Sequence, residues 1–191
     1  MPRKVTFELS DSDLRHFRKV MRQARSAAKN TPEKKTAKAA RKLLDKIREA
    51  SMPDFVRERL LHIDKLLAML DDPDWALSGE NRNRIVSALA YFNEPVDLIP
   101  DSVPGIGYLD DAIMVQLVVD ELQPDIEAYD DFCEFRKQLD RGRKPVKRNP
   151  DKQASLDVRR TQLHGRMRRR RTRRRQRAGS SRTSMKPFSL W

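Results

Sequence analysis

The chain has 191 residues, of which 38% are apolar and 36% charged, so it suits one modest hydrophobic core with charged extensions. A single cysteine excludes a disulfide framework and a cysteine-based metal site. No apolar run approaches the roughly 20 residues needed to cross a bilayer, and we therefore expect a soluble, cytoplasmic protein.

The net charge of +13 conceals three electrically different segments. Residues 1–50 hold 15 Lys and Arg against 6 Asp and Glu, residues 51–140 hold 7 against 20, and residues 141–191 hold 19 against 2. We predict a basic N-terminal segment whose helices pack on the body, an acidic helical body, and an arginine-rich tail that is disordered, in that order. Such an asymmetry indicates the partners of a protein rather than its fold.

Two helices are predicted in the first fifty residues. Ser10 is followed three residues later by Asp13, a capping-box pattern for a helix that runs to about Asn30. Pro32 then begins a second helix that ends near Glu49, because a proline at the first helical position loses no hydrogen bond.

A third helix is predicted from Pro53, and its apolar residues are spaced alternately by four and three. They are Val56, Leu60, Ile63, Leu67 and Leu70. This seam indicates packing in the core, with dimerisation as the alternative. Trp75 is expected to cover the end of the core. Ser78 caps a fourth helix that ends before Pro95, since the residue before a proline is disfavoured in the helical conformation.

The segment 93–111 reads NEPVDLIPDSVPGIGYLDD and joins two apolar helical patterns. Three prolines and two glycines hold this junction to an unusual shape. Helical spacing then predicts a helix over 110–122 and another that begins at Pro124. No segment predicts a sheet. We expect an all-α protein, a compact bundle of about five or six helices followed by the disordered basic C-terminal tail.

Ten residues of this junction and its C-terminal end form a pattern of their own: Pro95, Asp97, Leu98, Ile99, Pro100, Asp101, Pro104, Gly107, Asp110 and Asp111. Together with the preceding ALAYF, they resemble the signature of the YkvA-like or DUF1232 family of small helical proteins, whose biochemical role is not established. The resemblance covers about 85–121 and departs from the family pattern at Glu94, where serine is common. The resemblance therefore implies a small helical domain of this family, but it does not imply a biochemical activity.

The four aspartates of this segment, Asp97, Asp101, Asp110 and Asp111, admit three interpretations. In the one we favour, they bind backbone N–H groups in turns and at a helix start. They would otherwise converge on Ca²⁺ or Mg²⁺, in which case a metal-dependent enzyme is centred here, or dock a protein partner. We assign no cofactor, no small-molecule substrate and no catalytic residue. The sequence holds no P-loop, no nucleophile motif and no histidine metal motif, so we predict that the chain is not an enzyme.

Nine arginines lie within the twelve residues 166–177. They are Arg166, Arg168, Arg169, Arg170, Arg171, Arg173, Arg174, Arg175 and Arg177. Guanidinium groups bind phosphates in a bidentate way and stay charged, so this run predicts contact with RNA, DNA or a ribonucleoprotein. An anionic membrane surface, or an internal contact with the acidic body, would use the same charge.

The sequence therefore predicts a non-catalytic binding protein that contacts nucleic-acid phosphates nonspecifically through its tail. The alternative is a membrane-peripheral or scaffold protein that docks a protein partner through the acidic body and the signature loop.

Overall fold

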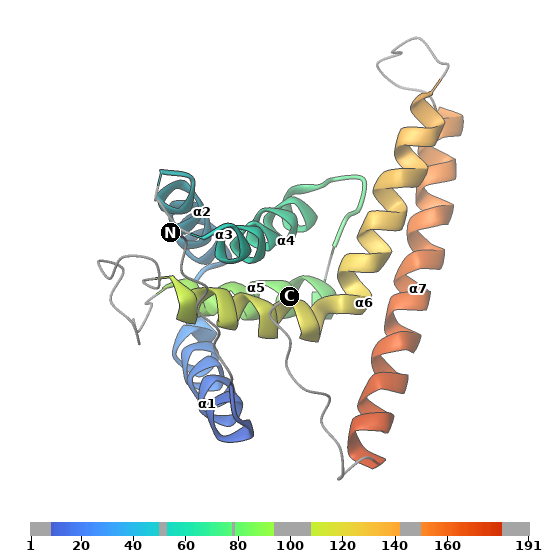
Figure 1. Cartoon of the computed structure of the whole chain (residues 1–191). Coiled ribbons are helices and arrows are strands. Elements are labelled where there is room, and N and C mark those ends of the chain that lie inside the picture. Colours follow the sequence, from blue (N-terminus) through green and yellow to red (C-terminus); the bar gives the residue numbers. More distant parts are fainter. Residues whose placement is uncertain (1–8, 50–52, 78, 94–107, 142–149, 181–191) are drawn as a thin grey trace. The chain divides into compact units, whose positions relative to one another are not determined.

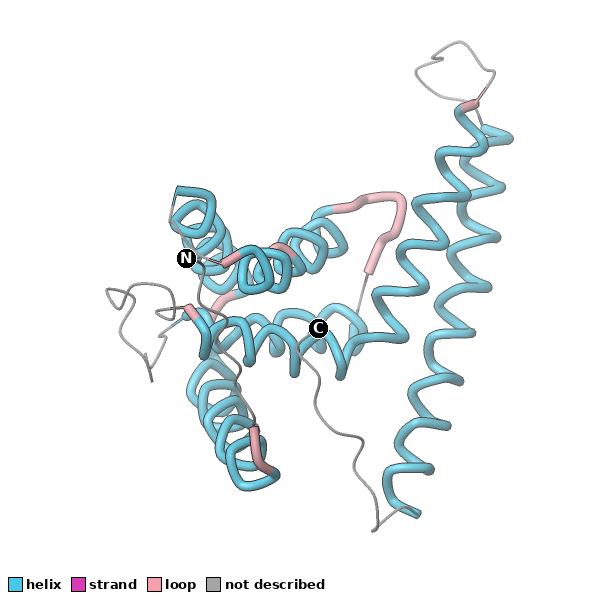
Figure 2. Tube along the Cα trace, viewed as in Figure 1, coloured by secondary structure: helices cyan, strands magenta, loops and turns pink. Residues whose placement is uncertain are grey.

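The protein is described by a computed structural model (Figures 1 and 2). The described residues are 9–49, 53–77, 79–93, 108–141 and 150–180. They form α-helices and short 3-10 helices with no strand among them, which confirms the expected all-α class. The described residues divide into two compact units: those within 9–61 and 86–117 make the first, and those within 62–85 and 118–180 make the second.

The first unit begins with α1 (Asp11–Ala27), whose start is fixed by the predicted capping box. The backbone N–H of Ser10 donates to the Asp13 carboxylate at 2.9 Å, and the backbone N–H of Asp13 donates to the Ser10 hydroxyl at 3.3 Å. These bonds satisfy two groups that a helix start leaves without partners. The first helix therefore starts where the sequence predicted.

The first unit contains further helices, three of which start within one residue of the predicted position. They are the 3-10 helix η1 (Ala28–Asn30), α2 (Glu33–Glu49), α3 (Asp54–Leu60), the end of α5 (Gly79–Leu89), the 3-10 helix η2 (Ala90–Asn93) and the first part of α6 (Leu109–Asp140). Both α1 and α2 pack on η2. The buried residues include Met21 of α1, Leu44 of α2, and Tyr91 and Phe92 of η2.

The second unit contains α4 (His62–Asp71), the start of α5, the larger part of α6, and α7 (Pro150–Ser180). The third predicted helix is divided in the structure, because α3 ends at Leu60 and α4 begins at His62. The five residues of its apolar seam are all buried, as the interpretation of core packing requires.

Two expectations about the C-terminal half are corrected. A separate helix was predicted from Pro124, but α6 continues through this proline without interruption. Pro124 has no N–H and cannot donate to the carbonyl four residues earlier, so the helix tolerates one missing bond.

The second correction concerns the segment from 141, which was expected to be disordered. Residues 150–180 instead form α7, while 142–149 and 181–191 lie outside the described residues. Burial of Leu156, Leu163 and Met167 along one side of α7 gives this highly charged segment the apolar contact that folding needs.

Candidate nucleic-acid interface

Helix α7 lies beside the second-unit part of α6 and runs antiparallel to it (Figure 1). Four ion pairs join the two helices: Asp125 with Arg171, Glu127 with Arg170, Asp131 with Arg166, and Asp140 with Lys152. The partner's number on α7 falls as the number on α6 rises, which is the register of an antiparallel pair. Acidic side chains of the body therefore hold part of the arginine-rich segment.

Arg171 is the buried end of this series. Its Nε donates to Asp125 at 3.1 Å, its Nη2 also binds that carboxylate, and Nη1 and Nη2 each lie 3.0 Å from Oδ1 of Asn81 on α5. Asp125 is 0% exposed and Arg171 is 8% exposed. Burial raises the pKa of Asp125, while the hydrogen bonds and charge of Arg171 and the charge of Arg84 oppose that rise. The sequence run predicted Arg171 as a phosphate ligand, but the structure gives it an internal partner.

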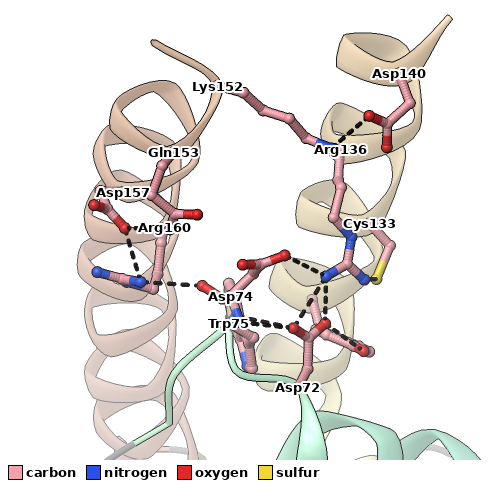
Figure 3. Close-up of polar contacts among 11 residues, drawn as sticks. Asp72, Asp74, Trp75, Cys133, Arg136, Asp140, Lys152, Gln153, Asp157 and Arg160 are labelled. Atoms are coloured by element: carbon pink, nitrogen blue, oxygen red, sulfur yellow. Dashed lines mark hydrogen bonds and ion pairs between the residues drawn. The ribbon is translucent and has the colours of Figure 1, made fainter. Parts of the chain in front are cut away.

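Asp72, in the turn that follows α4, is a second polar centre (Figure 3). Its carboxylate accepts from the backbone N–H groups of Asp74 at 2.9 Å and Trp75 at 3.2 Å. From α6, the Tyr129 hydroxyl donates at 3.0 Å and Arg136 Nη1 lies 2.8 Å away. This one side chain therefore fixes the turn and ties it to α6.

Helix α7 reaches the same turn through Arg160. Its Nη1 donates to the backbone carbonyl of Asp74 at 3.1 Å and pairs with Asp157, one turn earlier, at 3.0 Å (Figure 3). In the same turn Ala76 has φ of 47°, a left-handed conformation that costs a residue other than glycine about 1 kcal/mol. The surrounding polar contacts offset that strain.

Trp75 is fully buried below this polar layer. Its ring contacts Tyr129 and Phe132 of α6, with centroids 5.5 and 5.1 Å away. His164 of α7 meets it edge-on at 4.4 Å. Trp75 is buried, as its predicted place over the core requires, while the contact of a half-buried His164 with its ring had no local mark in the sequence.

The environment of His164 keeps its imidazole neutral. Burial lowers its pKa from 6.5 to about 4, and the neighbouring charges of Arg160, Arg168 and Arg171 act in the same direction. The imidazole of His164 binds a proton less readily in the folded than in the unfolded chain. Its contribution to the free energy of unfolding is therefore fully present above about pH 6.5. Part of that stability is lost as the pH falls from 6.5 towards 4.

We expect this loss to reach about 1 kcal/mol at about pH 5, after allowance for the partial exposure of the ring. His164→Phe removes the titrating group and keeps a ring against Trp75. Urea unfolding of the wild-type chain and of this variant at about pH 7 and about pH 5 measures the difference between their acid-side losses. Equal losses in the two proteins would show that His164 does not contribute.

The remaining six arginines of the predicted run are Arg168, Arg169, Arg173, Arg174, Arg175 and Arg177. All six are exposed, and within the part of the chain that the structure describes none of their guanidinium groups has an ion pair or hydrogen bond. The nine predicted residues thus separate into two groups. Arg166, Arg170 and Arg171 are paired with acids of α6, and the other six project from the last three turns of α7 with their charge available.

The aspartates of the signature loop are described only at its end. Asp97 and Asp101, with the other signature residues before Tyr108, lie outside the described residues. Asp110 and Asp111 are buried in the first turn of α6, at the helix start where their charge was expected. Among the described residues, no group of three or more histidine, cysteine, aspartate or glutamate side chains is arranged to hold a metal ion.

Over the described ranges, no helix combines the length and the apolar character that crossing a bilayer demands.

The helices define an all-α protein in which an arginine-rich helix is held on an acidic one. Residues 84–117 match the family described as "Protein of unknown function (DUF1232)", which confirms the family resemblance of this segment. The match includes the end of α5, η2 and the first turns of α6, and it excludes α7. No curated protein and no solved structure matches the chain. The arginine helix therefore has to be interpreted from its own geometry.

Proposed function

We propose that this chain is a non-catalytic binding protein that contacts RNA or DNA phosphates, without sequence preference, through the outer arginines of α7. These outer arginines are Arg168, Arg169, Arg173, Arg174, Arg175 and Arg177. The observation that carries the proposal is that all six are exposed on one helix and have no acidic partner among the described residues. Phosphate oxygens are the ligands that planar guanidinium groups bind best.

The separation of the α7 arginines into a paired and an unpaired group supports this function. The inward arginines and Lys152 meet acids of α6 and fix the helix, so they contribute little free charge. The outer arginines are then presented on an ordered helix, and binding does not have to pay for ordering the segment. Few contacts of the outer arginines would depend on base identity, because the exposed end of α7 offers mainly positive charge, which binds the phosphates of any sequence.

The test is a salt titration of binding by the full chain. Labelled single-stranded RNA, duplex DNA and anionic lipid vesicles are each mixed with the wild-type chain and with a variant in which the six outer arginines are glutamine. We expect wild-type binding to RNA and DNA that weakens steeply with salt, and a loss of about 100-fold in the variant at low salt. If about four of the six contact phosphates at once, the slope of log K against log salt on RNA falls by about 3.

A matched variant with lysine at the same six positions keeps the charge, and it should retain most of the affinity. Thermal unfolding checks that both variants keep the wild-type fold, since the paired arginines are untouched. Wild-type protein that ignores RNA and DNA at low salt would overturn the proposal, and binding to vesicles alone would assign the arginines to an anionic membrane surface.

A further inference from the structure

The first unit carries a second concentration of positive charge, on α1 and α2. One side of each helix is buried: Leu14 and Met21 of α1, and Ala37, Ala40 and Leu44 of α2. Both helices pack on η2. Their other sides are therefore turned away from the core of the unit.

Three basic residues follow the outer side of each helix. They are Arg15, Lys19 and Arg22 on α1, and Lys35, Lys38 and Lys42 on α2. Spacings of four and three, and of three and four, place each set on one helix face. All six side chains are exposed, and among the residues that the structure describes none has an ion pair or a side-chain hydrogen bond. We call the two helix faces that these six residues occupy, taken together, the α1–α2 basic face.

The stability of the helices does not explain this pattern. Like charges four residues apart, as in Arg15 with Lys19 and Lys38 with Lys42, destabilise a helix by a few tenths of a kcal/mol. The sequence also offers little local compensation, because Glu33 is the only acidic residue between Asp13 and Asp45. On α7, by contrast, acids of α6 neutralise the inward arginines. The charge of the α1–α2 basic face is thus left for a partner.

We propose that the α1–α2 basic face is a second phosphate-binding surface, so that one long nucleic-acid strand is held by both units at once. The inference rests on the proposed function of α7. Lysine is a compact, strongly hydrated charge that binds a phosphate without fixed geometry, which suits a face that follows a backbone of any sequence. Two weak surfaces that bind one strand gain affinity, because the second contact becomes intramolecular.

This arrangement predicts a dependence on strand length. A short oligonucleotide occupies one surface, and a long one occupies both. We expect the wild-type chain to bind a single-stranded RNA of about 60 nucleotides at least about 100-fold more tightly than one of about 10 nucleotides. Part of any such gain is statistical, because a longer strand offers more sites. A variant that keeps only one surface provides the reference for that part.

The experiment compares three full-length proteins on labelled poly-uridine of these two lengths. The first is the wild-type chain, the second carries glutamine at the six positions of the α1–α2 basic face, and the third keeps the charge there by exchanging lysine for arginine and arginine for lysine. The glutamine variant should keep its affinity for the short strand within a few-fold, because α7 is intact, and should lose most of the gain with length. The charge-preserving variant should keep the gain.

The outcomes separate the two proposals. A glutamine variant with the full wild-type gain on the long strand would overturn the α1–α2 basic face and leave the role of α7 standing. Wild-type protein that binds neither strand would overturn both. Circular dichroism and thermal unfolding of each variant confirm that the replaced residues, all exposed, leave the fold intact.

Discussion

Replacing Arg171 with methionine is expected to lower the free energy of unfolding by about 3 kcal/mol at neutral pH. Arg171 supplies two buried donors to the Asp125 carboxylate and two partly buried ones to Asn81. Methionine fills similar volume but leaves Asp125 without its nearest opposite charge, since Arg84 is 3.9 Å away. Breaking one side of a buried pair is costly because the remaining charge stays out of water.

The pH dependence of this variant gives a sharper test. Burial raises the pKa of Asp125, and loss of Arg171 removes the strongest opposing influence, so the carboxyl takes up a proton on folding. A folded-state pKa above the unfolded value means that stability falls as the pH rises. The deficit of Arg171→Met should therefore be smaller at about pH 5 than at about pH 7.

Urea unfolding at both pH values measures this deficit. Combining Arg171→Met with Asp125→Asn should recover more than half of it, because the uncompensated charge is gone. Arg168→Met is the matched control on the exposed side of α7 and should change stability by no more than about 0.5 kcal/mol. A deficit below about 1 kcal/mol in Arg171→Met would show that this pair does not hold α7 in place.

Replacing Asp72 with alanine is expected to cost about 3 kcal/mol as well. The substitution leaves the N–H groups of Asp74 and Trp75, the Tyr129 hydroxyl and the Arg136 guanidinium without their common acceptor. These groups are at least partly buried, so water replaces the acceptor incompletely. The turn that contains the left-handed Ala76 loses these two side-chain bonds to its backbone and keeps the bond from the Ala76 N–H to the backbone carbonyl of residue 72.

Asp72→Asn is the informative intermediate. Its amide oxygen can still accept from the N–H groups of the turn, but its N–H₂ group replaces the oxygen that accepts from Arg136 or Tyr129. We expect it to lose about half as much stability as the alanine variant. Glu134→Ala, which removes an exposed carboxylate of α6, is the control for the change in net charge. If Asp72→Ala were no less stable than this control, the contacts of Asp72 would carry no net stabilisation.

Local signals in the sequence were sufficient for the first three boundaries. Ser10 and Asp13 define the start of α1 through their own hydrogen bonds, and Pro32 precedes α2 by one residue. Pro124 was misleading, because proline is favoured in the first turn of a helix yet is tolerated inside one when the missing bond is offset elsewhere. Nothing local distinguishes the two cases.

The error over α7 has a different cause. Nine arginines in twelve residues repel one another and indicate disorder, and a contact with the acidic body was considered only as an alternative use of their charge. Leu156, Leu163 and Met167 repeat at intervals of seven and four, a helical spacing that marks the buried side of α7 from before the arginine run into its first residues. A periodic apolar side beside a charge run was thus the available signal.

The candidate interface could be predicted in composition but not in detail. The sequence indicated where phosphate-binding residues are concentrated, and six of the nine arginines are exposed without an acidic partner among the described residues. Which three would pair internally depends on the register between α6 and α7, and register is a tertiary property. Asn81 as a partner of Arg171 lies ninety residues away in sequence and had no local mark.

The acid–base pairing of α6 with α7 also shapes the kinetics of any encounter with a polyanion. Residues 118–140 and 150–180 together hold 14 Lys and Arg against 10 Asp and Glu, a net charge of +4, whereas 150–180 alone carry +10 from 12 against 2. At distances beyond the Debye length of about 8 Å a partner senses mainly the smaller sum. Electrostatic steering towards this helix pair is therefore weaker than the charge of α7 alone would give.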